Sequence, residues 1–248
     1  MPSLVRSLRS RPDAIAFLTV PDGAIATVAR DIAKADGVPP RSAFVHCSGA
    51  LGLGVLSPLR VQHSVGSFHP LQSFPKPRAP EAFRGSLVGI DATTAPLRRR
   101  LERLARDLGA KPRSVAEDER VIYHAAAVVA SNYLVALAGL AVDLLETIGW
   151  SERDAVAGLV PLMQGALAEV ARLGPTQALT GPIRRGDVDT VSRHMEGLAG
   201  GPAADLYRML GEIALELATE AGLEPAGARR VKRALTRDVA ATRRRRQG

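Results

Sequence analysis

The sequence predicts an α/β domain with a mostly parallel sheet, followed by an all-α domain. In the first part of the chain, short β-branched or apolar runs alternate with helical stretches, a pattern typical of parallel strands joined by crossover helices. From Glu117 onward the strand signals end, and long helical patterns follow one another with glycine and proline between them. We therefore expect an α/β domain at residues 1–115 and a helical domain at residues 116–248.

Five strands and two helices are expected in the first domain. The strands are predicted at Ala14–Val20, Ala43–Cys47, Ser64–Phe68, Leu87–Asp91 and Pro112–Val115. A helix is predicted at residues 22–35, where apolar side chains recur at helical spacing. Another is predicted at residues 93–108, where leucines share one face and arginines the other. These segments describe βαβ units.

Capping residues mark the helix starts of the second domain. Ser151 to Asp154 has the form of a capping box, so a helix is expected to begin just after Trp150. Asp187 is placed as the cap of a helix at residues 187–198, and a further amphipathic helix is expected at residues 203–221. The turn before Asp187 contains Arg184 and Arg185, which either bind an anionic ligand group or cap the turn in solvent.

Charge and cysteine content narrow the classes of function. The formal net charge is +8, but nine cationic residues follow Ala226, so the excess belongs largely to the C-terminal tail. No aromatic side chains interleave with this run, and we expect no nucleic-acid partner. Cys47 is the only cysteine, which excludes a disulfide framework and fits a cytoplasmic location. The five histidines are scattered without ligand spacing, so no metal site is expected.

One long stretch, between Arg120 and Asp143, contains no charged residue and is long enough to span a bilayer. Its alanine-rich composition, with His124, Ser131 and Asn132 inside it, fits a buried helix better. We therefore expect this helix to be buried in protein, and we expect no membrane partner.

Candidate site residues follow the second and third predicted strands. Ser48 and Gly49 are small enough to let a ligand approach backbone N–H groups, although a tight turn that needs Gly49 explains the same pattern. His69 and Pro70 follow the third strand directly, at the edge where sites of α/β sheets lie. An imidazole there can accept or donate a proton, so His69 is the first catalytic candidate, with a structural hydrogen bond as the alternative.

Polar residues also share one face of the helix expected after Glu117. His124 lies seven positions before Ser131 and eight before Asn132, so the three side chains fall on one face about two turns apart. An active-site cleft would satisfy their hydrogen bonds, and bonds between helices are the alternative.

The order of the motifs resembles a bacterial family that pairs a Rossmann-like domain with a helical domain of uncharacterised function. That family is related to pyrroline-carboxylate reductase, hydroxyisobutyrate dehydrogenase and prephenate dehydrogenase. The matching strings are Val20-Pro-Asp22, Ser48-Gly-Ala50, His69-Pro-Leu-Gln-Ser-Phe74, Ser131-Asn132 and Thr180-Gly-Pro-Ile183, and the resemblance extends from about Asp13 to Leu198. It implies that the second domain is similar to the C-terminal domain of 6-phosphogluconate dehydrogenase.

The resemblance implies an oxidoreductase that uses NAD or NADP and transfers hydride in the cleft between the two domains. It also implies a homodimer formed through the helical domain. In this interpretation, cofactor-binding residues are Val20, Pro21, Asp22, Ser48 and Gly49, catalytic residues are His69, His124 and Asn132, and residues that bind a small-molecule substrate are Ser131 and Gln72. Pro21 and Asp22 also suit a simple helix start. The related hydroxyacid dehydrogenases carry a lysine on the equivalent helix and this sequence does not, which leaves the proton-transfer role open.

The glycine-rich turn of a dinucleotide-binding fold is missing from this sequence. Such a turn lets the backbone and a helix N-terminus contact the pyrophosphate, whereas the glycines at residues 49–54 have a different spacing. The first domain is therefore expected to be a truncated Rossmann-like sheet. Three hypotheses stay open: an oxidoreductase, a non-catalytic remnant that serves as a dimerisation or binding module, and a fragment whose true start lies upstream.

Overall fold

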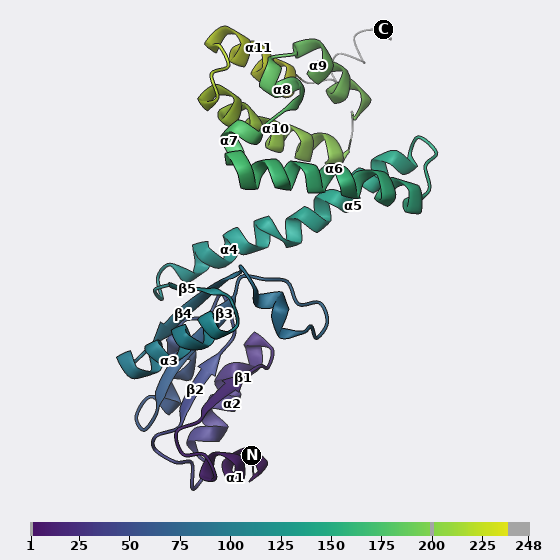
Figure 1. The fold of residues 1–248 in the computed structure, drawn as a ribbon. Helices are drawn as coiled ribbons and strands as arrows, with labels where there is room; N and C mark the ends of the chain where they lie inside the picture. The colour runs from purple at the N-terminus through teal and green to yellow at the C-terminus, as the bar shows by residue number, and fades with distance from the viewer. Residues whose placement is uncertain (1, 199–200, 238–248) are drawn as a thin grey trace. The chain divides into compact units, whose positions relative to one another are not determined.

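A computed structural model describes residues 2–198 and 201–237, and it divides the chain into two compact units (Figure 1). The first unit comprises Met1–Val135 and the second Ala136–Gly248. The boundary expected near Val115 coincides with the end of the sheet rather than with this division. The helix that follows belongs to the first unit because Arg120 and Tyr123 hydrogen-bond to the sheet.

The first unit contains one five-stranded sheet in the order β1-β2-β3-β4-β5. The strands are β1 (Ile15–Leu18), β2 (Ala43–His46), β3 (Ser64–Pro70), β4 (Leu87–Ala92) and β5 (Lys111–Ser114). β1, β2 and β3 are parallel, and β5 is parallel to β4. The prediction of a mostly parallel sheet is confirmed. β4 runs antiparallel to β3, so that connection needs no crossover helix and contains only a short 3₁₀ turn, η2 (Pro80–Phe83).

Helices cover both faces of this sheet. α1 (Pro2–Arg9), α2 (Asp22–Ala33) and the 3₁₀ helix η1 (Leu53–Leu59) contribute to one core, in which Ile25, Phe44 and Val65 are buried. α3 (Ala95–Asp107) contributes to the other core, in which Leu101 packs with Val45 and Ile90. Neighbouring residues of a strand alternate between the two cores because successive side chains point to opposite faces.

The second unit is all helical. Its helices are α5 (Asn132–Glu146), which begins in the first unit, α6 (Glu152–Leu173), α7 (Pro175–Ala178), α8 (Gly181–Arg185), α9 (Val188–Gly197), α10 (Pro202–Glu220) and α11 (Pro225–Thr236). A core formed by α8 to α11 buries Val191, Ala218, Val231 and Leu235. The predicted helix starts are confirmed, since Ser151 Oγ accepts a hydrogen bond from the Asp154 amide and Asp187 Oδ1 accepts one from the Thr190 amide.

The apolar stretch after Arg120 is not buried. α4 (Arg120–Ala130) continues into α5, and α5 has no buried residue in the single chain. By length and composition alone, Arg120–Glu146 and Glu152–Leu173 are each able to cross a membrane. The expectation of a buried helix is therefore wrong for one copy of the chain. An apolar composition shows that a helix is able to be buried, but it does not show whether another part of the chain covers the helix.

We predict that Leu101→Ala lowers the free energy of unfolding by about 3 kcal/mol, the usual cost of a cavity at a fully buried leucine. Leu101 has no exposed surface and lies beneath α3 against the sheet. Urea unfolding followed by circular dichroism measures the change. Arg103→Ala, at an exposed position of the same helix, is the control and should have little effect. An equally small change for both variants would contradict the described packing of α3.

Candidate functional site

The carboxyl ends of β2 and β3 bring several of the predicted residues to one edge of the sheet. β2 ends at His46 and is followed by Ser48 and Gly49, and His69 lies near the end of β3. Because β1, β2 and β3 are parallel, their carboxyl ends share the edge where α/β sheets bind ligands. α4 adds His124 to this edge, beside His69.

His69 is hydrogen-bonded to a tyrosine that sequence reasoning missed. The Nδ1 atom of His69 lies 2.9 Å from the hydroxyl oxygen of Tyr123. Gly89 pairs with His69 across β3 and β4, and a Cβ atom at Gly89 would lie 2.9 Å from the same hydroxyl oxygen. The missing side chain at Gly89 therefore gives Tyr123 the room to reach His69. The His69 and His124 rings lie with their centroids 6.1 Å apart.

Gly49 provides room for these two imidazoles. A Cβ atom at Gly49 would lie 2.7 Å from His69 Nε2 and 2.7 Å from His124 Cδ2. The conformation of Gly49 is not left-handed, so a tight turn is not the reason for glycine here. In this structure the groups that approach the Gly49 backbone are the His69 and His124 side chains, and the approach of a ligand stays a prediction.

Ser48 and Asp22 join the loops that follow β1 and β2. The Ser48 hydroxyl donates to Asp22 Oδ2 over 2.6 Å and accepts from the Leu51 amide over 3.1 Å. Pro21 is the N-cap of α2 and Asp22 is its first residue, while Val20 packs partly against the core beside α2. The interpretation of Pro21 and Asp22 as a helix start is confirmed, Asp22 also accepts the Ser48 hydrogen bond, and their role in cofactor binding stays a prediction.

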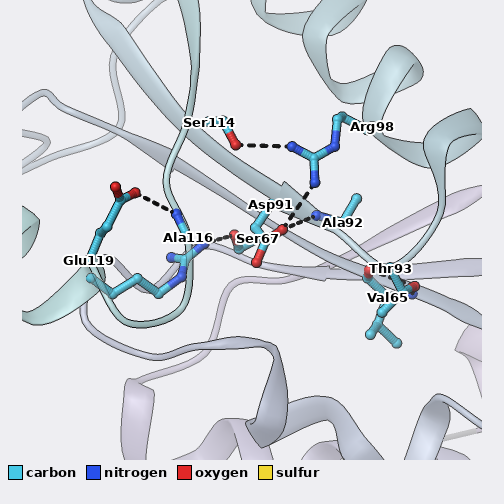
Figure 2. A network of polar contacts seen from close by, with 10 residues as sticks. Val65, Ser67, Asp91, Ala92, Thr93, Arg98, Ser114, Ala116 and Glu119 are labelled. Carbon is cyan, nitrogen blue, oxygen red and sulfur yellow. Dashed lines mark hydrogen bonds and ion pairs between the residues drawn. The ribbon is translucent and has the colours of Figure 1, made fainter.

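A row of polar residues crosses the sheet beside the site, in which His46 and Ser67 are buried and Asp91 is half-buried. His46, Ser67 and Asp91 are in register on β2, β3 and β4, on the face opposite the core of α3. Arg120 of α4 donates through Nη2 to the Ser67 hydroxyl, and its guanidinium is almost completely buried. Figure 2 shows Ser67 and Asp91, and it shows Arg98 reaching both Asp91 and Ser114.

Sequence reasoning missed Arg120, Tyr123, His46, Ser67 and Asp91. The available signal was the spacing on the helix. Tyr123 and His124 lie three and four positions after Arg120, so the three side chains share a face. Among the described residues, the Nε and Nη1 atoms of Arg120 and both ring nitrogens of His46 have no hydrogen-bond partner. Unpaired buried polar atoms are rare, so this row is a specialised feature rather than ordinary core.

The surroundings keep the imidazoles of His46 and His69 neutral near pH 7. The pKa of His46 is lowered to about 4, mainly by burial and then by the charge of Arg120, while the charges of Asp22 and Asp91 act in the opposite direction. Burial also lowers the pKa of His69 to about 4, with His124 and Arg120 contributing in the same direction. Burial raises the pKa of the Cys47 thiol to about 11, so the thiol is protonated and poorly suited to be a nucleophile. His69 and Tyr123 are thus a neutral pair able to exchange a proton with a bound molecule.

The other predicted residues form hydrogen bonds elsewhere than with His69. Gln72 is held in its own loop, where Nε2 donates to the Ala82 carbonyl over 3.2 Å and Oε1 accepts from the Ser73 amide. Ser131 ends α4 and donates to the Ala127 carbonyl and to Asn132 Oδ1. Within residues 2–198 and 201–237, neither Ser131 nor Asn132 hydrogen-bonds to His69 or His124. No cluster of three or more metal-ligating side chains occurs in those residues.

The fold and the site define a protein with a Rossmann-like α/β unit followed by a helical unit, and residues 5–70 match a Rossmann-like domain. Residues 86–214, which are 129 of the 248 residues, match the domain of unknown function DUF2520. The chain belongs to the DUF2520 family. This confirms the resemblance to a family with a Rossmann-like domain and a helical domain. No protein of curated function matches the chain.

Solved structures support the fold. The crystal structure of protein TM1727 from Thermotoga maritima is 28% identical, with a TM-score of 0.67 over 82% of this chain and 78% of that protein. Protein BF3122 from Bacteroides fragilis, assigned as an NADP oxidoreductase, is 24% identical, with a TM-score of 0.64 over 84% and 76% of the two chains. Pyrroline carboxylate reductase from Plasmodium falciparum with NADP bound is 12% identical, with a TM-score of 0.54 over 94% and 80%.

We predict that the stability of the chain falls as the pH decreases from about 6.5 to about 4. In that window the unfolded state binds more protons, since unfolded His46 and His69 take up protons near their ordinary pKa of 6.5 whereas the folded chain takes them up at about 4. The contribution is fully present above pH 6.5. Urea unfolding at pH 7 and pH 5 measures the loss, which should be smaller in His46→Leu. An identical loss in that variant would show that His46 is not kept neutral by the fold.

Proposed function

We propose that this protein is an oxidoreductase that uses NAD or NADP and acts on a small molecule, with His69 as the acid or base. The observation that carries the proposal is the hydrogen-bonded pair of His69 and Tyr123 at the carboxyl edge of parallel strands. Two solved structures of this fold support the choice of reaction class, since BF3122 is assigned as an NADP oxidoreductase and the Plasmodium falciparum pyrroline carboxylate reductase has NADP bound.

In this proposal, the edge beside the pair holds the nicotinamide end of the cofactor. A hydrogen bond between Ser48 and Asp22 links the loop that follows β1 to the loop that follows β2 at this edge. Val20, Pro21 and Gly49 complete the cofactor-binding set in this proposal. When bound, the nicotinamide would supply or accept the hydride. The sequence has no glycine-rich turn with the spacing that binds a pyrophosphate, so the proposed contacts are with the nicotinamide end.

His69 and its neighbours would handle the proton of the reaction. A neutral imidazole accepts a proton from a substrate hydroxyl as hydride leaves, and the same group, once protonated, donates it in the reverse direction. Tyr123 orients the ring through Nδ1 and leaves Nε2 as the atom that faces Gly49. His124 and Asn132 are proposed to orient the substrate, with Ser131 and Gln72 as further contacts. Arg120 favours the neutral form of His69 through its charge.

We also propose that two copies of the chain form a homodimer through their exposed apolar helices. Val156, Val160, Leu167 and Val170 of α6 are each at least 43% exposed, and their spacing places them on one stripe. Val121, Ile122, Val129 and Val135 of α4 and α5 are at least 59% exposed. Surfaces this apolar are typical of protein interfaces rather than of a monomer in water. This dimer is compatible with the oxidoreductase and with a non-catalytic dimerisation module.

The proposed activity is tested by calorimetric titration of the full chain with NADPH and NADH, followed by a screen of carbonyl and hydroxyl substrates. We expect micromolar binding of one cofactor. His69→Gln should bind it with similar affinity but lose turnover by about 10²-fold or more, the usual contribution of a general acid or base.

His194→Gln is the matched control, because His194 pairs with Tyr207 in the second unit over 2.8 Å, as His69 pairs with Tyr123. It should retain turnover. Absence of binding to either cofactor by a chain that circular dichroism shows to be folded would exclude the oxidoreductase and favour the dimerisation or binding module.

For the homodimer, light scattering after gel filtration should give about twice the chain mass of 26.2 kDa. Leu167→Glu should shift the protein to monomer, because it places a charge within the proposed interface. Val61→Glu is the control, since Val61 is 89% exposed and lies outside these helices. A monomeric parent chain, or recovery of the parent chain with lipid vesicles rather than in solution, would refute the dimer.

A further inference from the structure

A groove in the second unit is independent of the site around His69. It has a volume of about 870 Å³ and lies between the turn that contains α8 and the start of α11. Figure 1 shows both of these helices. Sites for small molecules usually have volumes of about 300 to 1,000 Å³, so the groove is large enough for a metabolite with more than one functional group.

The groove is positively charged. Arg184, Arg185 and Arg230 line it, and Glu224 is the only acidic residue among its lining residues. Arg184 Nη2 donates to the Ala221 carbonyl over 2.9 Å, which ties the α8 turn to the loop before α11. Arg185 and Arg230 form no hydrogen bond or ion pair with any residue that the structure describes. These two guanidinium groups are thus available to a ligand.

One further acidic residue, Asp187, lies close to Arg185 but outside the groove lining. Hydrogen bonds to Thr190 are the main cause of the lowered pKa of the Asp187 carboxyl. The charge of Arg185 contributes less in the same direction. Asp187 therefore acts as the N-cap of α9. With three arginines and one glutamate, the lining carries a net charge of +2, which suits a ligand with more than one negative charge.

The backbone leaves space for an anion to approach. Gly181, Gly186 and Gly222 have φ angles of 91°, 68° and 96°, a conformation that side chains other than glycine rarely adopt. The helix α11 begins without a side-chain cap and has no acidic residue in its first turn. Ala226 and Gly227, in the first turn of α11, line the groove. Leu179 and Leu223 add apolar surface for the uncharged part of a ligand.

We propose that this groove binds a small molecule that carries a phosphate group, held by Arg185 and Arg230 against glycine-rich backbone. Guanidinium groups bind phosphate oxygens with geometrically matched, charge-assisted hydrogen bonds. Leu179 and Leu223 contact the apolar part of the ligand. The proposal does not depend on a nicotinamide cofactor at the edge of the sheet, since every residue of the groove lies between Gln177 and Arg230.

The test is calorimetric titration of the full chain with inorganic pyrophosphate at fixed ionic strength. We expect saturable binding, and we expect the double variant Arg185→Ala, Arg230→Ala to raise the Kd at least about tenfold. The matched control is Arg229→Ala, Arg233→Ala, which removes the same charge from exposed positions of α11 outside the groove lining. The control should bind pyrophosphate with the parent Kd.

Two results would overturn the proposal. One is the absence of saturable pyrophosphate binding by the folded parent chain. The other is an equal loss of affinity in both double variants, which would show a general attraction of anions to a chain of net charge +8 rather than a groove. Circular dichroism of each variant establishes that loss of binding is not loss of fold.

Discussion

Two hydrogen bonds between α4 and β3 hold the candidate site together. Arg120 donates to Ser67, and Tyr123 bonds to His69, so residues three apart on the helix meet residues two apart on the strand. The spacings are about 4.5 Å along a helix and about 6.6 Å along a strand, so the two contacts set the position of the helix on the strand. His124 lies beside His69 as a result.

This arrangement places a buried cation beside histidines that must stay neutral. Removing a guanidinium from water costs several kcal/mol unless its charge and hydrogen bonds are compensated. Asp91, in the same row of the sheet, partly compensates the charge of Arg120, and Ser67 accepts one of its hydrogen bonds. The same charge opposes protonation of His46 and His69. Neutral imidazoles at neutral pH are the form in which a histidine accepts a proton from a substrate.

The two units carry different kinds of surface. The first presents a compact cluster of polar side chains on a sheet whose faces are both covered by apolar cores. The second combines a small helical core with a basic groove and with apolar helices that the single chain leaves exposed. A proton-transfer site needs burial, whereas a groove for a charged ligand and a surface for a second copy both need exposure. The proposed acid–base pair lies in the first unit and the groove in the second, whereas the proposed dimer surface includes α4 of the first unit as well as α6 of the second.

The sequence alone determined the local elements. The periodicity of β2 and α3 located both segments to within a few residues, and the caps Ser151 and Asp187 located the helix starts, because these signals depend on neighbouring residues. The same reasoning selected Ser48 and Gly49, which follow β2, and His69, which was expected just after the third strand but lies within the last paired residues of β3 (Ser64–Pro70) at the same edge of the sheet.

Only the tertiary structure decided the rest. The antiparallel direction of β4, the exposure of α5, and the pairing of His69 with Tyr123 depend on residues far apart in the chain or on what covers a helix. In the sequence, Arg120 has the pattern of an exposed charged residue at the start of an apolar helix. Its burial against Ser67 results from the packing of α4 on β3. Periodicity records which side of an element is apolar, but the identity of its neighbour is set by the packing of the whole unit.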